Sequence, residues 1–139
     1  MYGIAQEGTR VGHAENNLRA EIILGLKKGY GGFTQEKEEV LNFLTDSYKE
    51  SLKKEKNYIP FVVTQCVITY AYPGADGPVA EHEPALVLTA EKSPLYGDES
   101  DEEWQILVEE YAAALAGQFE QRRVYVSYTR AELKIFQRS

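Results

Sequence analysis

The sequence predicts an α+β domain with the ferredoxin-like order βαββαβ: an antiparallel sheet with two helices on one face, plus a C-terminal extra strand. Three observations lead to this fold class. A strand–helix–strand pattern that begins near Arg19 is repeated from Ala85 onward. The chain has 139 residues, enough to bury one hydrophobic core. Right-handed crossovers in both halves would place the strands in the spatial order fourth, first, third, second.

The first unit follows a polar stretch. Residues 1–18 show no apolar periodicity, and we expect them to form a flexible N-terminal arm outside a single domain of residues 19–139. Alternating apolar residues predict a short strand over 19–26. Thr34 is expected to cap a helix with an apolar stripe at helical spacing. The stripe consists of Val40, Leu41, Leu44, Tyr48 and Leu52. Residues 59–72, rich in β-branched and aromatic side chains, should form the longest strand, at an edge of the sheet.

The second unit begins with a hairpin. Proline and glycine residues within 73–78 predict a wide turn, after which 85–90 returns as the antiparallel partner strand. The segment Ser100–Glu103 has the spacing of a capping box at the start of the second helix. The buried stripe of that helix is expected to comprise Trp104, Leu107, Val108, Tyr111, Leu115 and Phe119. Alternating residues then predict a fourth strand over 124–128 and the extra strand over 131–135.

Composition argues against several classes of function. The formal net charge is −7, which disfavours general nucleic-acid binding, because such binding draws on cations that neutralise phosphates. Acids gather at the predicted helix starts, where the helix dipole favours them. The single cysteine, Cys66, excludes an internal disulfide and suits a reducing compartment. No apolar run reaches the roughly 20 residues of a membrane span, so we expect a cytoplasmic protein without membrane attachment.

The most basic and aromatic stretch of the chain is the first candidate for a ligand site. Its residues are Arg122, Arg123, Tyr125 and Tyr128. Guanidinium groups suit phosphate, and aromatic rings stack on nucleobases, so this surface is typical of a nucleotide clamp. The alternative is that these arginines pair with acids on the same or a neighbouring subunit.

The glycine-rich segment before the first helix is the second candidate. Free amides at a helix start attract anions, and Lys27, Lys28 and Tyr30 would supply further contacts. A turn that needs positive φ angles is the stronger explanation for Gly29, Gly31 and Gly32.

The order of elements resembles a family of small uncharacterised bacterial α+β domains. The resemblance rests on a strand that ends at Gly25, a helix, a long strand, and Glu83–Pro84 opening the next apolar strand, and it covers about residues 19–137. By topology, the wider relatives are ferredoxin-like and tautomerase-like domains. Tautomerase-like enzymes use a proline directly after the initiator methionine as their base. Tyr2 stands at that position here, so the resemblance does not imply tautomerase chemistry.

No residue pattern predicts catalysis. The segment Glu81–Glu83 is interpreted as a solvated loop and His13 as part of the arm, so we predict no metal site and no cofactor. An uncovered apolar sheet face predicts a homo-oligomer, with a dimer preferred. The main interpretation is a non-catalytic oligomeric binding or interaction module that sequesters a small anionic ligand, such as a nucleotide, or binds a protein partner. The alternatives are a small cofactor-independent enzyme with a cleft at the subunit interface, and an acidic protein inhibitor of a basic partner.

Overall fold

A computed structural model describes residues 8–28, 33–95 and 97–138 of the chain. The elements are, in order, β1 (Gly8–Gly25), α2 (Lys37–Lys53), β2 (Val62–Gly74), β3 (Gly77–Glu91), α3 (Asp101–Gln118) and β4 (Tyr125–Arg138). They form an α+β domain with four antiparallel strands and two helices, which confirms the predicted α+β class. No helix in these ranges is both long enough and apolar enough to cross a membrane.

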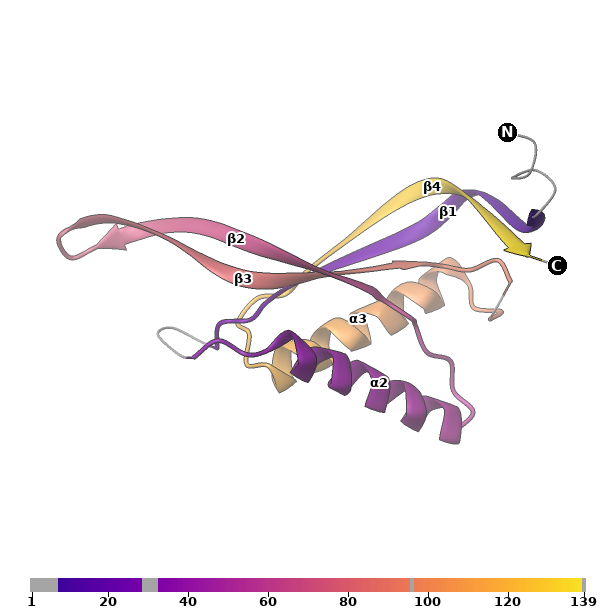
Figure 1. Ribbon diagram of the computed structural model, residues 1–139, viewed down its shortest axis with the longest axis horizontal. Coiled ribbons are helices and arrows are strands. Elements are labelled where there is room, and N and C mark those ends of the chain that lie inside the picture. The colour runs from indigo at the N-terminus through magenta and orange to yellow at the C-terminus, as the bar shows by residue number, and fades with distance from the viewer. Residues whose placement is uncertain (1–7, 29–32, 96, 139) are drawn as a thin grey trace.

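The sheet has the order β2-β3-β1-β4, and each neighbouring pair is antiparallel. This is the predicted spatial order, with β2 at one edge. Both helices lie on the same side of the sheet and run in opposite directions (Figure 1). The β2–β3 hairpin and the β1–β4 ribbon extend past the helices at opposite ends of the molecule. Among the described residues, no helix lies on the other face of the sheet.

β1 and β4 are longer than the sequence predicts. Residues 8–18, expected within a flexible arm, belong to β1 and pair with the second half of β4. Residues 131–135, expected to be a separate extra strand, are part of that second half. Bulges interrupt this ladder twice, and Asn16 in the second one has a φ of 51°. Because bulges break the alternation of apolar and polar residues, pattern analysis misses strands of this kind. The rest of the predicted arm, residues 1–7, lies outside the described residues.

β3 also begins earlier than predicted. The expected wide turn is a tight one between Gly74 and Gly77, where Gly77 has a φ of 120° that favours glycine. The segment Glu81–Glu83, interpreted from the sequence as a solvated loop, therefore lies inside β3. Its side chains occupy fixed positions on a hairpin instead of a mobile connection.

The start of α2 differs from the prediction. Its N-cap is Glu36, whose side chain makes no capping hydrogen bond, so the assignment of Thr34 as the cap was wrong. Thr34 instead forms a bridge with Lys27, and the amide of Gln35 donates to the carbonyl of Leu26 at 2.7 Å. Backbone pairing with the end of β1 thus keeps the chain extended for two more residues.

The hydrophobic core lies between the helices and the face of the sheet that they cover. The largest fully buried side chains are Ile22, Leu24, Val40, Ile59, Leu86, Leu88, Val108 and Leu115. The predicted capping box of α3 is confirmed, with reciprocal hydrogen bonds between Ser100 and Glu103 at 3.0 and 3.1 Å. The predicted stripe of α2 is shorter than expected, because Leu52 is 61% exposed. Because both helices pack on one face of the sheet, the candidate site lies on the opposite face.

Candidate functional site

The helix-free face of the sheet is hollowed beside the β2–β3 hairpin. A cleft of about 680 Å³ lies between the hairpin and the segment that leads from α3 into β4. β1 and β2 contribute Ile23, Gly25 and Ile68 to its lining. Small-molecule sites are typically clefts of this size that combine apolar walls with a few polar groups.

Glu81, on the β3 side of the cleft, accepts hydrogen bonds from two tyrosines of β2. The Tyr70 hydroxyl donates to Oε2 at 3.0 Å and the Tyr72 hydroxyl donates to Oε1 at 3.1 Å. Tyr70 pairs directly with Glu81 in the hairpin, and Tyr72 lies two residues further along on the same face. The bonds from Tyr70 and then Tyr72 lower the pKa of Glu81, and the same bonds raise the pKa of both phenols. At neutral pH the site therefore presents an ionised carboxylate held by two protonated tyrosines.

Lys27 lies beside this carboxylate and is held in place by its backbone. Its Nζ atom is 3.7 Å from Oε2 of Glu81. Its amide donates to Oε2 of Glu83 at 3.1 Å, and its carbonyl accepts from Nε2 of Gln121 at 2.8 Å. Gly25 makes this arrangement feasible, since a Cβ there would lie 2.9 Å from Oε1 of Gln121 and 3.1 Å from Oε2 of Glu83.

Replacing Gly25 with alanine is expected to destabilise the fold by about 1 kcal/mol, because a Cβ displaces side chains that hydrogen-bond the backbone of Lys27. Gly117→Ala is the control: Gly117 lies in α3, no atom of the described residues lies within 4 Å of its Cβ position, and alanine should stabilise the helix by about 0.5–1 kcal/mol. Urea unfolding measures both changes. If both variants changed the free energy of unfolding equally and in the same direction, position 25 would be shown to tolerate a side chain.

Several residues predicted from the sequence line this cleft. Arg122, Arg123 and Tyr125 lie on the side that follows α3, and Lys27 lies near Glu81. Both arginines and Tyr125 are exposed on the open face. The structure thus brings cations and an aromatic ring to the same hollow as Glu81, and their role in binding a ligand stays a prediction.

Two of the other predicted residues, Tyr128 and Lys28, do not line the cleft. Tyr128 points to the opposite face, where its hydroxyl donates to Oε2 of Glu109 at 2.6 Å, and burial first of all raises its pKa. Because residues 125 and 128 differ in parity along one strand, alternation alone could have separated them. Lys28 forms an ion pair with Glu120. Tyr30 lies outside the described residues.

Three residues of this site, Tyr70, Tyr72 and Glu81, are not among the site residues predicted from the sequence. Two tyrosines spaced by two residues on a strand do share a face, which is a usable signal. Glu81, the acid that they bind, was not predicted, because the segment Glu81–Glu83 was interpreted as a loop and not as part of the hairpin. A two-residue turn at Gly74–Gly77 would have paired Tyr70 with Glu81 directly.

A smaller hollow of about 240 Å³ lies at the second bulge of β1, near the start of α3. Three of its charged groups pair with one another: Asp101 contacts Lys92 at 2.9 Å through Oδ1 and Arg130 at 2.7 Å through Oδ2. Hydrogen bonds from Lys92 and then Arg130 lower the pKa of Asp101. The side chains around this hollow hold β1, β4 and α3 together, which is a structural role. The cleft beside Glu81 is therefore the stronger candidate site.

Comparison with known proteins finds a similarity in fold to solved structures. No protein-family model and no curated protein matches it, so the resemblance to uncharacterised bacterial domains stays a prediction. Two solved structures are similar. A phage SAM lyase in the apo state gives a TM-score of 0.60 at 16% identity, with 94% of each chain covered. A phage SAM lyase in complex with S-methyl-5'-thioadenosine gives 0.54 at 16% identity, covering 91% of this chain and 92% of that one.

These neighbours correct the main functional interpretation. Both are named as enzymes, and the similarity extends over almost the whole of each chain. The finding overturns the interpretation of the chain as a non-catalytic binding module. It favours the alternative interpretation, a small cofactor-independent enzyme with a cleft at the subunit interface, over that module.

Proposed function

We propose that this protein is an enzyme that cleaves a carbon–sulfur bond of S-adenosylmethionine in the cleft beside Glu81. The proposal is supported by the shared fold, since one similar structure is a SAM lyase that holds S-methyl-5'-thioadenosine. That compound is S-adenosylmethionine without its four-carbon amino-acid part. When the bond breaks, its electron pair goes to the positive sulfonium sulfur, which becomes a neutral thioether, while the carboxylate oxygen of the substrate forms the new bond to the released carbon and closes a lactone.

The observation that carries the proposal is the ionised carboxylate of Glu81, fixed by the hydroxyls of Tyr70 and Tyr72 at the cleft. Lys27 lies 3.7 Å from Oε2 of this carboxylate, so we assign attraction of the sulfonium and ammonium groups of the substrate to the side of the carboxylate that carries Oε1. The tyrosine rings lie nearly parallel, at 23° with centroids 6.4 Å apart, and offer surfaces on which an adenine can stack. Arg122 and Arg123, on the other side, suit the substrate carboxylate.

The test is incubation of the purified chain with S-adenosylmethionine, with the products separated by liquid chromatography and identified by mass. We expect S-methyl-5'-thioadenosine to accumulate in proportion to enzyme and time. S-adenosylhomocysteine is the matched control, because its sulfur is neutral and is a poor leaving group. Absence of product above the spontaneous background, together with no binding in calorimetry, would contradict the proposal.

The proposed enzyme is an oligomer, preferentially a dimer, with the cleft near the subunit interface. The open face exposes apolar side chains such as Val62, which is 69% exposed, and such surface favours pairing. Light scattering should give at least twice the chain mass of 15.7 kDa. Val62→Lys should shift the mass toward the monomer, whereas Val67→Lys, on the opposite face of the same strand, should not. A monomer at micromolar concentration would show that one chain builds the site alone.

A further inference from the structure

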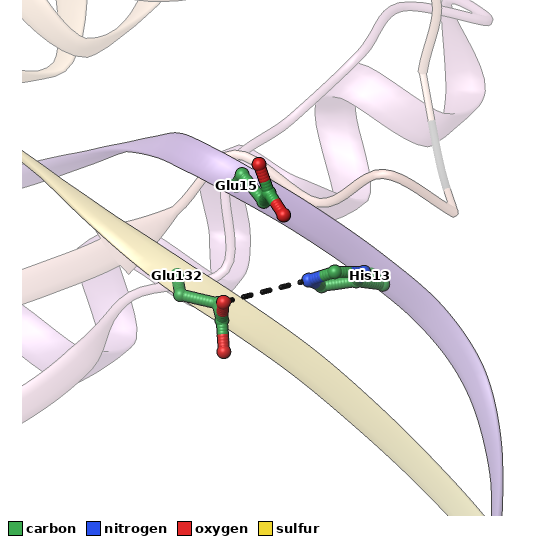
Figure 2. A group of neighbouring side chains, drawn as sticks. All are labelled: His13, Glu15 and Glu132. Atoms are coloured by element: carbon green, nitrogen blue, oxygen red, sulfur yellow. Dashed lines mark ion pairs between the residues drawn. The ribbon is translucent and has the colours of Figure 1, made fainter.

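A second group of chemically active side chains lies far from the cleft, on the β1–β4 ribbon. His13 and Glu15 belong to β1 and Glu132 belongs to β4 (Figure 2). One potential ligand atom from each of the three lies within 4.8 Å of the other two. Among the residues that the structure describes, this trio is the set of His, Cys, Asp and Glu side chains that approach closely enough to share an ion.

Strand geometry explains why these residues meet. Residues 13 and 15 are two apart on one strand, so their side chains share a face of the ribbon. His13 pairs with Lys134 across the ladder, and Glu132 lies two residues from Lys134 on that same face. From the sequence, His13 is expected in a flexible arm without a ligand role. Pairing of β1 with β4 gives His13 a fixed position diagonally across the ladder from the carboxylate of Glu132.

The distances suit a transition-metal ion. Two ligand atoms about 2.1 Å from a common tetrahedral ion lie about 3.4 Å apart. Nε2 of His13 is 3.7 Å from Oε2 of Glu132, so a small side-chain adjustment would allow both to bind one ion. Lys134 does not block this oxygen, because its Nζ contacts the other one, Oε1, at 3.2 Å.

We propose that His13, Glu15 and Glu132 form a binding site for a divalent transition ion of the Zn²⁺ class. An imidazole nitrogen with two carboxylates favours zinc over magnesium or calcium, which prefer oxygen ligands only. The site has three protein ligands on an exposed surface, so water would complete the coordination. Its ligands come from both strands, and a bound ion would therefore join β1 to β4.

The histidine content of the chain provides a matched control. The chain has two histidines, His13 and His82, and His82 is exposed on the β2–β3 hairpin. Calorimetric titration of the full chain with ZnCl₂ should give one saturable site per chain. His13→Asn should weaken this site about tenfold or more, since it removes a ligand, and His82→Asn should leave it unchanged.

Two further variants make the result decisive. Glu132→Gln should weaken binding, whereas Lys134→Ala should strengthen it severalfold, because the lysine competes for the same carboxylate. Circular dichroism establishes that each variant is folded, and added zinc should raise the melting temperature of the parent chain but not of His13→Asn. The proposal is overturned if no saturable binding occurs, if binding survives in His13→Asn, or if His82→Asn loses it equally.

Discussion

Replacing Glu81 with glutamine is expected to lower kcat/KM for cleavage of S-adenosylmethionine about 10- to 100-fold, the range typical of a lost charge-assisted contact. Glutamine keeps the size of the side chain and removes the negative charge that faces the cationic substrate. Glu39→Gln is the control, because Glu39 is exposed on α2, on the opposite side of the sheet. Initial rates over a range of substrate concentrations give kcat/KM for both variants. Equal activity of Glu81→Gln and the parent chain would remove Glu81 from the catalytic machinery.

The pH dependence of the same reaction tests how Glu81 is held. The bonds from Tyr70 and then Tyr72 lower the pKa of Glu81, so its charged form persists below the ordinary glutamate pKa of about 4.3. Activity should therefore show no acid limb from Glu81 between about pH 5 and pH 8. Tyr70→Phe removes the largest contribution, which moves the pKa of Glu81 upward and any acid limb to higher pH. An unchanged profile in this variant would mean that Glu81 does not set the acid limb.

The elements that carry strong periodicity could be predicted from the sequence. The apolar stripe and capping box of α3 gave that helix correctly, and two strand–helix–strand units gave the sheet order. The elements that failed are those in which backbone pairing outweighs side-chain pattern. The first half of β1 is polar and interrupted by bulges, and Thr34 is drawn into a bridge with Lys27 instead of a cap.

The candidate site was predictable only in part, for a related reason. Arg122 and Arg123 stand out in an acidic chain by composition, and both line the cleft. The pairing of Tyr70 with Glu81 depends on the register of a hairpin, and a change in turn length of one residue would place them on opposite faces. Composition identifies charged stretches, whereas register determines which charges meet.

The largest effect on stability is expected from Leu115→Ala, which should lower the free energy of unfolding by about 2–5 kcal/mol. Leu115 lies in α3, and its side chain is fully buried against the core, with no exposed fraction. Its truncation removes apolar contacts and leaves a cavity that neighbouring side chains fill only in part. Urea denaturation should show a lower midpoint with an unchanged slope.

Leu52→Ala provides a control with the same chemistry in the other helix. Leu52 lies near the end of α2 and is 61% exposed, so its truncation should change stability by no more than about 0.5 kcal/mol. Leu107, which packs at the edge of the core, should give an intermediate loss. The order Leu115, Leu107, Leu52 therefore tests which parts of the two predicted stripes cover the sheet. If Leu52→Ala were as destabilising as Leu115→Ala, the last turn of α2 would have to be covered by another surface, and a second copy of the chain would be the first candidate to examine by light scattering.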